Sequence, residues 1–371
     1  MTNPLHVGII GANANRGWAK ESHVIAVQKL AGLELAAIAT RRQETADAAA
    51  KAFSAQSAYG NPADLIQDPD IDLVAVCVRV PNHRELVLGA ITAGKHIYCE
   101  WPLGRNITET EEMAAAAHNA GVHVAIGLQA RMSPAVHRAC DLIASDEIGR
   151  VLSARLYSST GAFGEKMVAA DAYLENAENG ATLITIHGGH ALDLASMVLG
   201  QLEDVSALTT IQYPKIEVGD DLKRQARSIP DHLLVQAHLV SGALLSIEVA
   251  GGRPPGSPFR LEVIGEKGVL ALDGGALRGF PTGRLHLSLN AQPQPINEGE
   301  LEVMPDTAAN VAGVYAALRD DIAHGSVIAP DFTHAAHLAR LVDVVESSAQ
   351  TGTRSKSRLD LSPHSLLPNR L

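Results

Sequence analysis

Residues 6–19 read HVGIIGANANRGWA, and this stretch decides the fold. A short apolar run leads into a glycine-rich turn, and the turn opens a helix-like segment that extends to about residue 30. In such a unit the backbone N–H groups of the turn and the positive end of the helix face a pyrophosphate. The stretch therefore predicts the start of a dinucleotide-binding domain, with a plain tight turn of an α/β protein as the alternative.

The spacing of this turn departs from the usual dinucleotide fingerprint. Gly11 and Gly17 bracket the turn, Asn13 stands where a second glycine is normal, and one extra residue lengthens the loop. The order of strand, turn and helix still matches the setting that the fingerprint requires. We therefore expect Gly11, Asn13, Gly17 and the next residue, Trp18, to contact the cofactor.

The end of the second predicted strand indicates which nicotinamide cofactor is bound. An acidic residue there would bind the ribose 2′-hydroxyl and repel a 2′-phosphate. The sequence instead reads IATRRQET, which places Thr40, Arg41 and Arg42 at this position. A hydroxyl and two guanidinium groups favour NADP as the cofactor, with NAD still possible, because two adjacent arginines are also common at a solvated helix start.

The pattern of elements changes between residues 126 and 150. Before this region, short apolar strands alternate with helical patterns, which is typical of a parallel sheet covered on both faces. After it, segments such as VLSARLYSS (151–159) and FRLEVIGEKGVLALDGG (259–275) predict strands joined by glycine-containing turns. We expect an α/β chain with an N-terminal Rossmann domain over residues 1–126. A C-terminal α+β domain with a large, mainly antiparallel open sheet should follow over residues 127–371, with late helices near 307–324 and 332–350.

Composition narrows the class of protein. The chain has 371 residues, of which 46% are apolar, and a formal net charge of -11 without a block of lysine or arginine. This charge argues against a nucleic-acid surface. A basic leader and an apolar run of about 18 residues are both absent, so neither a signal peptide nor a membrane span is expected. Cys77, Cys99 and Cys140 lack metal-ligand spacing, which fits a reducing, cytoplasmic setting.

Four motifs together resemble the Gfo/Idh/MocA oxidoreductases across nearly the whole chain. They are the glycine-rich turn, VRVPNH (78–83), EWP (100–102), and GGHALDL (188–194) ahead of the β-rich part. Segments such as LQARMSP (128–134) are most similar to the branch that contains the fungal galactose-regulon repressor, a non-enzymatic relative that binds NAD(P). The resemblance implies a Rossmann domain, a second domain whose open sheet serves oligomer contacts, and a substrate held between the two.

The resemblance also shows which catalytic groups are absent. Family enzymes usually carry Glu-Lys-Pro where this chain has Glu100-Trp101-Pro102, and the lysine handles the proton of the reacting oxygen. Trp101 cannot replace it, because an indole N–H only donates. The usual aspartate four residues before the histidine is Ile186 here, so only His190 remains. Two of the three proton-handling groups are therefore missing.

His190 is the best-placed acid–base candidate, because imidazole titrates near neutral pH. His187 lies three residues before it and Asp193 three residues after it, so the three share a helix face if the segment is helical. Asp193 would orient His190, or it is only an early helix charge. The histidines would equally suit a structural role in an inactive relative. No metal site is expected, since no further ligands are predicted near these side chains.

Other site residues follow from where the resemblance places the cleft. Gln129 is expected at the cofactor, and Arg131 at a carboxylate or sugar hydroxyl unless it forms an interdomain salt bridge. Tyr173 and Asn179 precede the histidine helix and are expected to touch substrate, as is the flat apolar face of Trp101. The remaining predicted cofactor contacts come from two loops and are Val80, Pro81, His83, Glu100, Trp101 and Pro102.

Three functions fit these residues. The first is an NADP-dependent oxidoreductase that acts on a sugar or another polyhydroxylated small molecule. The second is a non-catalytic NADP-binding regulator that acts through a protein partner, and the third is a redox-neutral NADP-using lyase. In each case we expect neither nucleic acid nor membrane as a partner. The strands within 235–252 and 259–272 also predict a sheet face too apolar for solvent, and hence a homodimer or homotetramer.

Overall fold

The computed structural model describes residues 4–254, 256 and 258–357. Contacts divide the chain into two compact units. The first comprises Met1–Met132 and Glu298–Ala336, and the second comprises Ser133–Asn297 and His337–Leu371.

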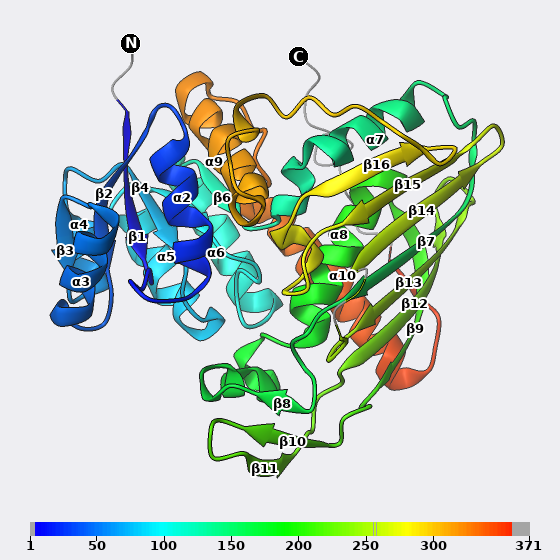
Figure 1. Cartoon of the computed structure of the whole chain (residues 1–371), viewed down its shortest axis with the longest axis horizontal. Helices are drawn as coiled ribbons and strands as arrows, with labels where there is room; N and C mark the ends of the chain where they lie inside the picture. The colour runs from blue at the N-terminus through cyan, green and yellow to red at the C-terminus, as the bar shows by residue number, and fades with distance from the viewer. Residues whose placement is uncertain (1–3, 255, 257, 358–371) are drawn as a thin grey trace. The chain divides into compact units, whose positions relative to one another are not determined.

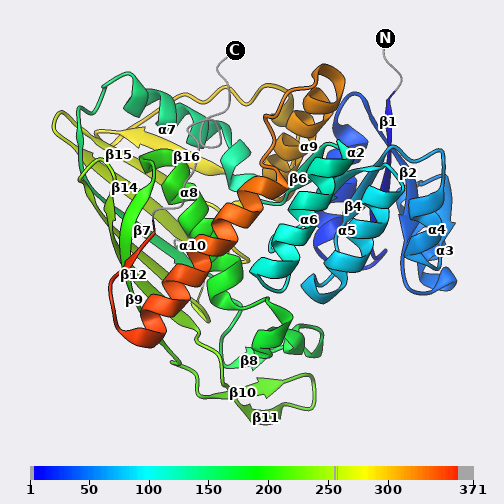
Figure 2. The ribbon, with the colours of Figure 1, turned by 180° about the vertical axis from the view of Figure 1, so that it is seen from behind.

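The first unit contains a parallel sheet with helices on both faces. Its strands are β1 (Leu5–Ile10), β2 (Leu33–Ala39), β3 (Ser57–Tyr59), β4 (Leu73–Val76), β5 (His96–Cys99) and β6 (Val124–Ile126). Its helices before residue 132 are α1 (Trp18–Glu21), α2 (His23–Lys29), α3 (Gln43–Phe53), α4 (Pro62–Gln67), α5 (His83–Thr92) and α6 (Ile107–Ala120). α2 lies over one face in Figure 1, and α5 and α6 lie over the other in Figure 2. Both faces are thus covered, which explains why β4 is buried along its whole length.

The order of the strands locates a ligand crevice. The strands run β3-β2-β1-β4-β5-β6, and β1 pairs in parallel with both β2 and β4. The direction in which the sheet grows therefore reverses between β1 and β4. At such a switch point the loops beyond the carboxyl ends of the strands diverge and leave room for a dinucleotide.

The second unit is built on a nine-stranded, mainly antiparallel sheet in the order β17-β16-β15-β14-β7-β13-β12-β9-β18. The strands are β7 (Val151–Ser159), β9 (Leu202–Thr210), β12 (His232–Leu239), β13 (Leu244–Ala250), β14 (Phe259–Gly265), β15 (Val269–Gly274), β16 (Leu285–Leu289), β17 (Gln292–Pro293) and β18 (Ser355–Lys356). β7 and β13 pair in parallel, whereas the other pairs described in this sheet are antiparallel. The predicted fold class is confirmed.

Helices cover one face of the large sheet, and a small sheet extends from it. α7 (Pro134–Ala144) and α8 (Gly189–Leu199) pack on the buried face, and α10 (Phe332–Thr351) is joined to β9 where the Ala207 N–H donates to the Ser348 hydroxyl at 3.1 Å. The small sheet has the order β11-β10-β8 and lies beyond one end of the large sheet in Figure 1. Its strands are β8 (Lys166–Met167), β10 (Lys215–Val218) and β11 (Lys223–Ala226).

The predicted boundary after residue 126 differs from the observed division because of one late helix. α9 (Asp306–His324) packs against α2, and its buried Val314 and Tyr315 share a core with Val24 of α2. Residues 298–336 therefore return to the first unit. A helical pattern shows that this segment has an apolar face, but not which sheet the face will cover.

No helix among the described residues combines the length and the apolar character needed to cross a membrane.

Candidate functional site

The glycine-rich turn after β1 has the backbone geometry that a pyrophosphate requires. Gly11 has φ +105°, and a Cβ on it would lie 2.4 Å from the carbonyl oxygen of Cys77, so only glycine fits at this position. Gly17 has φ +104°, and a Cβ there would meet nothing within 4 Å, which leaves open space beside the start of α1. Asn13 closes the turn by accepting the N–H of Asn15 at 2.9 Å. The turn is thus tightly packed at Gly11 and open at Gly17, beside the N-terminal end of α1.

The end of β2 presents two arginines without ion-pair partners among the described residues. Thr40 Oγ1 donates to the Arg42 carbonyl at 2.9 Å and lies 2.6 Å from Thr45 Oγ1, which fixes the start of α3. Arg41 and Arg42 are exposed beside it. The predicted residues are therefore together, with Thr40 shaping the loop and the two guanidinium groups available to an anion.

His83 packs between the loops that follow β4 and β5. Its ring is buried, with Nδ1 3.0 Å from the Pro102 carbonyl oxygen and Nε2 3.0 Å from that of Val78. Burial lowers the pKa of His83, and the neutral ring carries a single N–H, which can donate to the carbonyl of only one of these loops. His83 therefore packs between the two loops and bonds one of them, and its contact with the cofactor stays a prediction. Val80 and Pro81 lie in the short helical turn of the loop after β4.

Glu100, directly after β5, is the centre of a hydrogen-bonded cluster. The Trp18 indole N–H donates to Oε2 at 3.0 Å, and His23 Nε2 lies 2.9 Å from Oε1. His23 Nδ1 lies 2.9 Å from the Tyr315 hydroxyl of α9. Since a carboxylate only accepts, His23 donates through Nε2–H, and its Nδ1 then accepts from Tyr315 in the neutral ring. Trp18 and Glu100, both predicted to contact the cofactor, thus bond each other.

Sequence reasoning missed three members of this cluster: His23, Tyr98 and Tyr315. The ring of Tyr98 lies 4.9 Å from that of His23 and 4.7 Å from that of Tyr315. Burial raises the pKa of both phenols well above the usual range, so they stay protonated. His23 and Tyr315 are 292 residues apart, and no local pattern marks them as partners.

Trp101 and Gln129 end the loops after β5 and β6. Trp101 is only 7% exposed, so its indole is part of the wall of this unit. Gln129 is buried, and its Oε1 has no hydrogen-bond partner among the described residues. A buried amide oxygen without a partner is uncommon and points to a missing donor, such as a ligand or a water. Arg131, two residues later in the same turn, is also buried.

The histidine segment of the second unit begins as a π-helix. Residues Ile184–Gly188 are π-helical and lead into α8, so the segment is helical, but His187 stands in a π-helical turn and His190 in an α-helix. His187 is buried with the ring of Phe163 edge-on at 5.9 Å, and burial next to His190 lowers its pKa to about 3. His187 is therefore neutral near pH 7. His190 and Asp193 are buried one turn further along α8.

The predicted substrate residues Tyr173 and Asn179 lie together in the segment before this helix. Asn179 Nδ2 donates to the Tyr173 carbonyl at 2.7 Å, which closes a short loop. Among the described residues, no group of three or more His, Cys, Asp or Glu side chains is arranged to hold a metal ion.

Two family models match the two units. Residues 5–128 match an oxidoreductase family with an NAD-binding Rossmann fold, and residues 134–274 match the Gal80p C-terminal domain. The chain thus carries a Gfo/Idh/MocA-type Rossmann domain followed by a Gal80p-like C-terminal domain. The resemblance found in the sequence, including its Gal80-like branch, is confirmed. The first unit is therefore a Rossmann domain of the kind that binds a nicotinamide cofactor.

Its relatives include both dehydrogenases and a regulator. Dehydrogenase aclE of Aspergillus oryzae is 29% identical over 97% of this chain and 100% of its own length. The galactose/lactose metabolism regulatory protein GAL80 of Saccharomyces cerevisiae is 28% identical over 74% of this chain and 67% of its own length. The crystal structure of a super-repressor mutant of Gal80p from the same organism has a TM-score of 0.85 and covers 95% of this chain and 98% of its own. Levoglucosan dehydrogenase in complex with NADH and L-sorbose has a TM-score of 0.81 at 21% identity, over 96% and 100% of the two chains.

His187 should make the folded protein sensitive to acid. Its pKa is about 3 in the folded state against an ordinary value of 6.5, so the unfolded state binds more protons between these values. Stability from this residue is present above about pH 6.5 and is lost as the pH falls toward 3. Between the two pKa values each pH unit changes the free energy of unfolding by about 1.4 kcal/mol. His187 should therefore lower the free energy of unfolding by roughly 2–3 kcal/mol between about pH 7 and about pH 4.5.

Urea unfolding at these two pH values measures this contribution. The His187→Gln variant should lose less free energy of unfolding on acidification than the wild type, by about this amount. His286 is exposed on β16 of the same unit, so His286→Gln should behave like the wild type. Equal losses in all three proteins would contradict the prediction.

Proposed function

We propose that the protein is an NADP-dependent oxidoreductase that acts on a sugar or a related polyhydroxylated small molecule. The observation that carries the proposal is the end of β2. Thr40 shapes this loop, Arg41 and Arg42 are exposed beside it, and the acid that would select NAD is absent. The dehydrogenases among the relatives support the reaction class.

The residues present fit a dinucleotide. The backbone from Gly11 to Gly17 would hold the pyrophosphate, the two arginines would bind the 2′-phosphate, and the buried Gln129 amide oxygen would gain a donor. When bound, the nicotinamide exchanges a hydride with the substrate carbon. The remaining task of the chain is to move one proton at the substrate oxygen.

His190 is the residue we assign to that proton. Trp101 has no exchangeable proton near neutral pH, and the neutral, buried His187 stays unprotonated in this range. Asp193, three residues after His190 on α8, would orient the imidazole. Tyr173 and Asn179 of the second unit would hold hydroxyls of the substrate, and Arg131 and the face of Trp101 stay the substrate contacts expected from the first unit.

A non-catalytic NADP-binding regulator is the second candidate. The observation that favours it is the replacement of two proton-handling groups, by Trp101 and Ile186, in a chain that is similar to GAL80 over most of its length. A regulator of this kind would keep the dinucleotide site and act through a protein partner. Cofactor binding without turnover would therefore favour it.

The two arginines should determine the choice of cofactor. The Arg41→Ala/Arg42→Ala double variant should bind NADPH about ten- to hundredfold more weakly, because two charge-assisted contacts to the 2′-phosphate are lost, while NADH affinity changes less than about twofold. Calorimetry measures both affinities. Lys51→Ala/Arg84→Ala removes the same charge from exposed positions of the same unit and should leave both unchanged. Equal affinity of the wild type for NADH and NADPH would contradict the assignment.

His190 should control turnover and not cofactor binding. The His190→Asn variant should lose about 10²–10⁴-fold in kcat, the usual contribution of a general acid or base, with NADPH affinity unchanged within about twofold. A screen of sugars, inositols and hydroxy acids, followed by nicotinamide absorbance, supplies the substrate. His286→Asn is the matched control. Unchanged turnover in His190→Asn would refute the role of His190 in proton transfer. Cofactor-dependent quenching of tryptophan emission without turnover of any substrate would favour the non-catalytic regulator.

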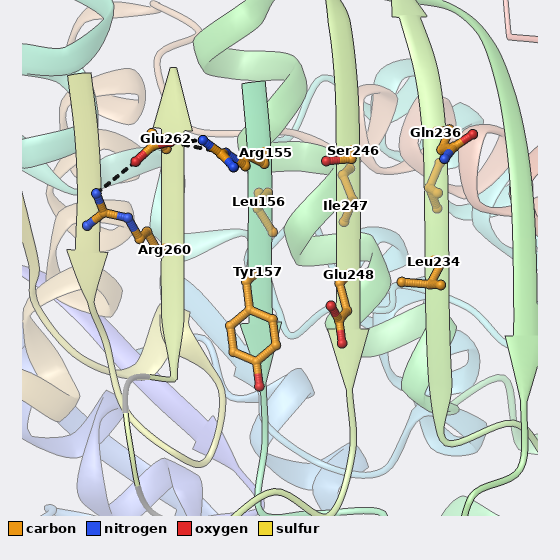
Figure 3. Close-up of a pocket in the computed structure, with 11 residues that line it drawn as sticks. Arg155, Leu156, Tyr157, Leu234, Gln236, Ser246, Ile247, Glu248, Arg260 and Glu262 are labelled. Carbon is orange, nitrogen blue, oxygen red and sulfur yellow. Dashed lines mark hydrogen bonds and ion pairs between the residues drawn. The ribbon is translucent and has the colours of Figure 1, made fainter. Parts of the chain in front are cut away.

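We also propose that the protein is a homo-oligomer that associates through the open face of the large sheet. Figure 3 shows this face, which carries an open hollow of about 520 Å³. Leu234 and Leu208 stand directly opposite each other on β12 and β9 and are 43% and 66% exposed. The face is less apolar than the sequence predicted, because Arg155 and Arg260 bind Glu262 across it, while Val235 and Ile247 point into the core.

Charge placed in the leucine pair should weaken self-association. The Leu208→Glu/Leu234→Glu variant should be monomeric at micromolar concentration, since burial of two carboxylates opposes the interface. Light scattering measures the mass. Val303→Glu changes a residue of equal exposure in the first unit and should leave the assembly intact. A monomeric wild type at the same concentration would overturn the proposal.

A further inference from the structure

Arg227, directly after β11, is a fully buried arginine whose guanidinium joins separate segments of the second unit. Nη1 donates to the Phe163 carbonyl at 2.6 Å and to Asp231 Oδ2 at 3.0 Å. Nη2 donates to the Gly164 carbonyl at 3.0 Å and to Glu175 Oε1 at 2.8 Å, and Nε donates to Glu175 Oε2 at 3.1 Å. Every N–H of the guanidinium is thus used. Lysine, with three donors and no planar fork, could not reproduce this set.

The partners of Arg227 attach the small sheet to the large one. Asp231 lies just before β12 and also accepts the N–H groups of Gln212 at 2.7 Å and Tyr213 at 2.9 Å. Tyr213 donates through its hydroxyl to the Gly252 carbonyl at 3.0 Å. Gly252 approaches Gly164 so closely that a Cβ on it would lie 2.5 Å from the Gly164 Cα. We call residues 163–180 and 212–227, which include β8, β10 and β11, the lobe.

On one side, Arg227 holds a strained residue against the histidine segment. Phe163 has φ +60°, which is rare for a bulky L residue and persists only when its surroundings enforce it. The hydrogen bond from Arg227 to its carbonyl supplies part of that enforcement. The ring of Phe163 is buried and meets the ring of His187 edge-on at an interplanar angle of 90°. Arg227 therefore helps to hold the ring of Phe163 against His187, which lies three residues before His190.

On the other side, Arg227 holds the segment that carries the predicted substrate residues. Glu175 binds the guanidinium through both oxygens and lies two residues after Tyr173. Asn179 in turn donates to the Tyr173 carbonyl. The Arg227 side chain is fully buried and that of Glu175 is only 7% exposed, so solvent screens this pair weakly.

We propose that Arg227 is a positioning residue for substrate. Through Glu175 it fixes the segment with Tyr173 and Asn179, and through Phe163 it fixes the segment with His187, so that the two keep one relative placement. This inference rests on the proposed function, because it takes Tyr173, Asn179 and His190 as the residues that meet substrate. Arg227 itself touches neither substrate nor cofactor in this role.

The Glu175→Gln variant tests the role, because its amide keeps one acceptor oxygen for Arg227 but places an NH2 donor where the second oxygen accepted. A circular-dichroism spectrum like that of the wild type shows that the variant is folded. Hydrogen–deuterium exchange should become faster in residues 163–180 and in residues 184–190. KM for the substrate should rise about tenfold or more, while kcat falls less and NADPH affinity stays within about twofold of the wild type. Arg227→Lys should give an intermediate KM. Glu217→Gln breaks an exposed pair with Arg224 in the same lobe and should behave like the wild type.

The outcomes separate this inference from the proposed function. Unchanged exchange in both segments, or faster exchange with unchanged KM, would overturn the positioning role. A loss of NADPH affinity as large as the rise in KM would also overturn it, since the effect would then be general. If the wild type turns over no substrate, the proposed function fails by itself, and hydrogen–deuterium exchange in the two segments then decides the inference. Faster exchange in both segments of the Glu175→Gln variant supports a structural connection between them through Arg227. Faster exchange in only one segment, or in neither, rejects it.

Discussion

The Glu100 carboxylate accepts hydrogen bonds from Trp18 and His23, and these bonds connect the loop after β5 to the helices that follow the glycine-rich turn. Trp18 begins the helix after the glycine-rich turn, and His23 continues the bond to Tyr315 on α9. A partly buried carboxylate is costly without donors, so these bonds favour the arrangement that brings the glycine-rich turn and the loop after β5 together. Through His23 and Tyr315 the same chain of bonds reaches α9, whose buried side chains also share a core with α2.

The same carboxylate lies close to a neighbouring loop. A Cβ on Gly127, just after β6, would lie 2.8 Å from Glu100 Oε1, so a side chain there would push this carboxylate away from Trp18 and His23. His83 packs against the loop after β5, with Nδ1 3.0 Å from the Pro102 carbonyl oxygen. Trp101 lies between Glu100 and Pro102 in this loop and is only 7% exposed, so its indole is packed within the protein.

Local constraints were predictable from the sequence, and long-range partners were not. Gly11 could be recognised because an apolar strand followed at once by a glycine-rich turn and a helix is a short pattern in the sequence. The glycine-containing turns between the strands of 235–275 likewise predicted a mainly antiparallel sheet, although not the parallel pairing of β7 with β13. His23 and Arg227 gave no such signal, because their roles depend on partners from distant parts of the chain. The π-helical turn at His187 was also missed, since spacing of three residues reads as α-helix.

The two sets of interactions depend on different residues, which bears on how one fold can serve both a dehydrogenase and a regulator. The proposed cofactor contacts at Gly11 and at the arginines after β2, together with the Glu100 cluster, lie within the first unit. His190, proposed for proton transfer, and the Arg227 network lie within the second. The hydrogen bonds described for the Glu100 cluster and for Arg227 each join residues of one unit. Substitutions at such separate sites usually have additive effects, so on the proposed assignment a change at His190 would alter turnover while the cofactor site keeps its own hydrogen bonds.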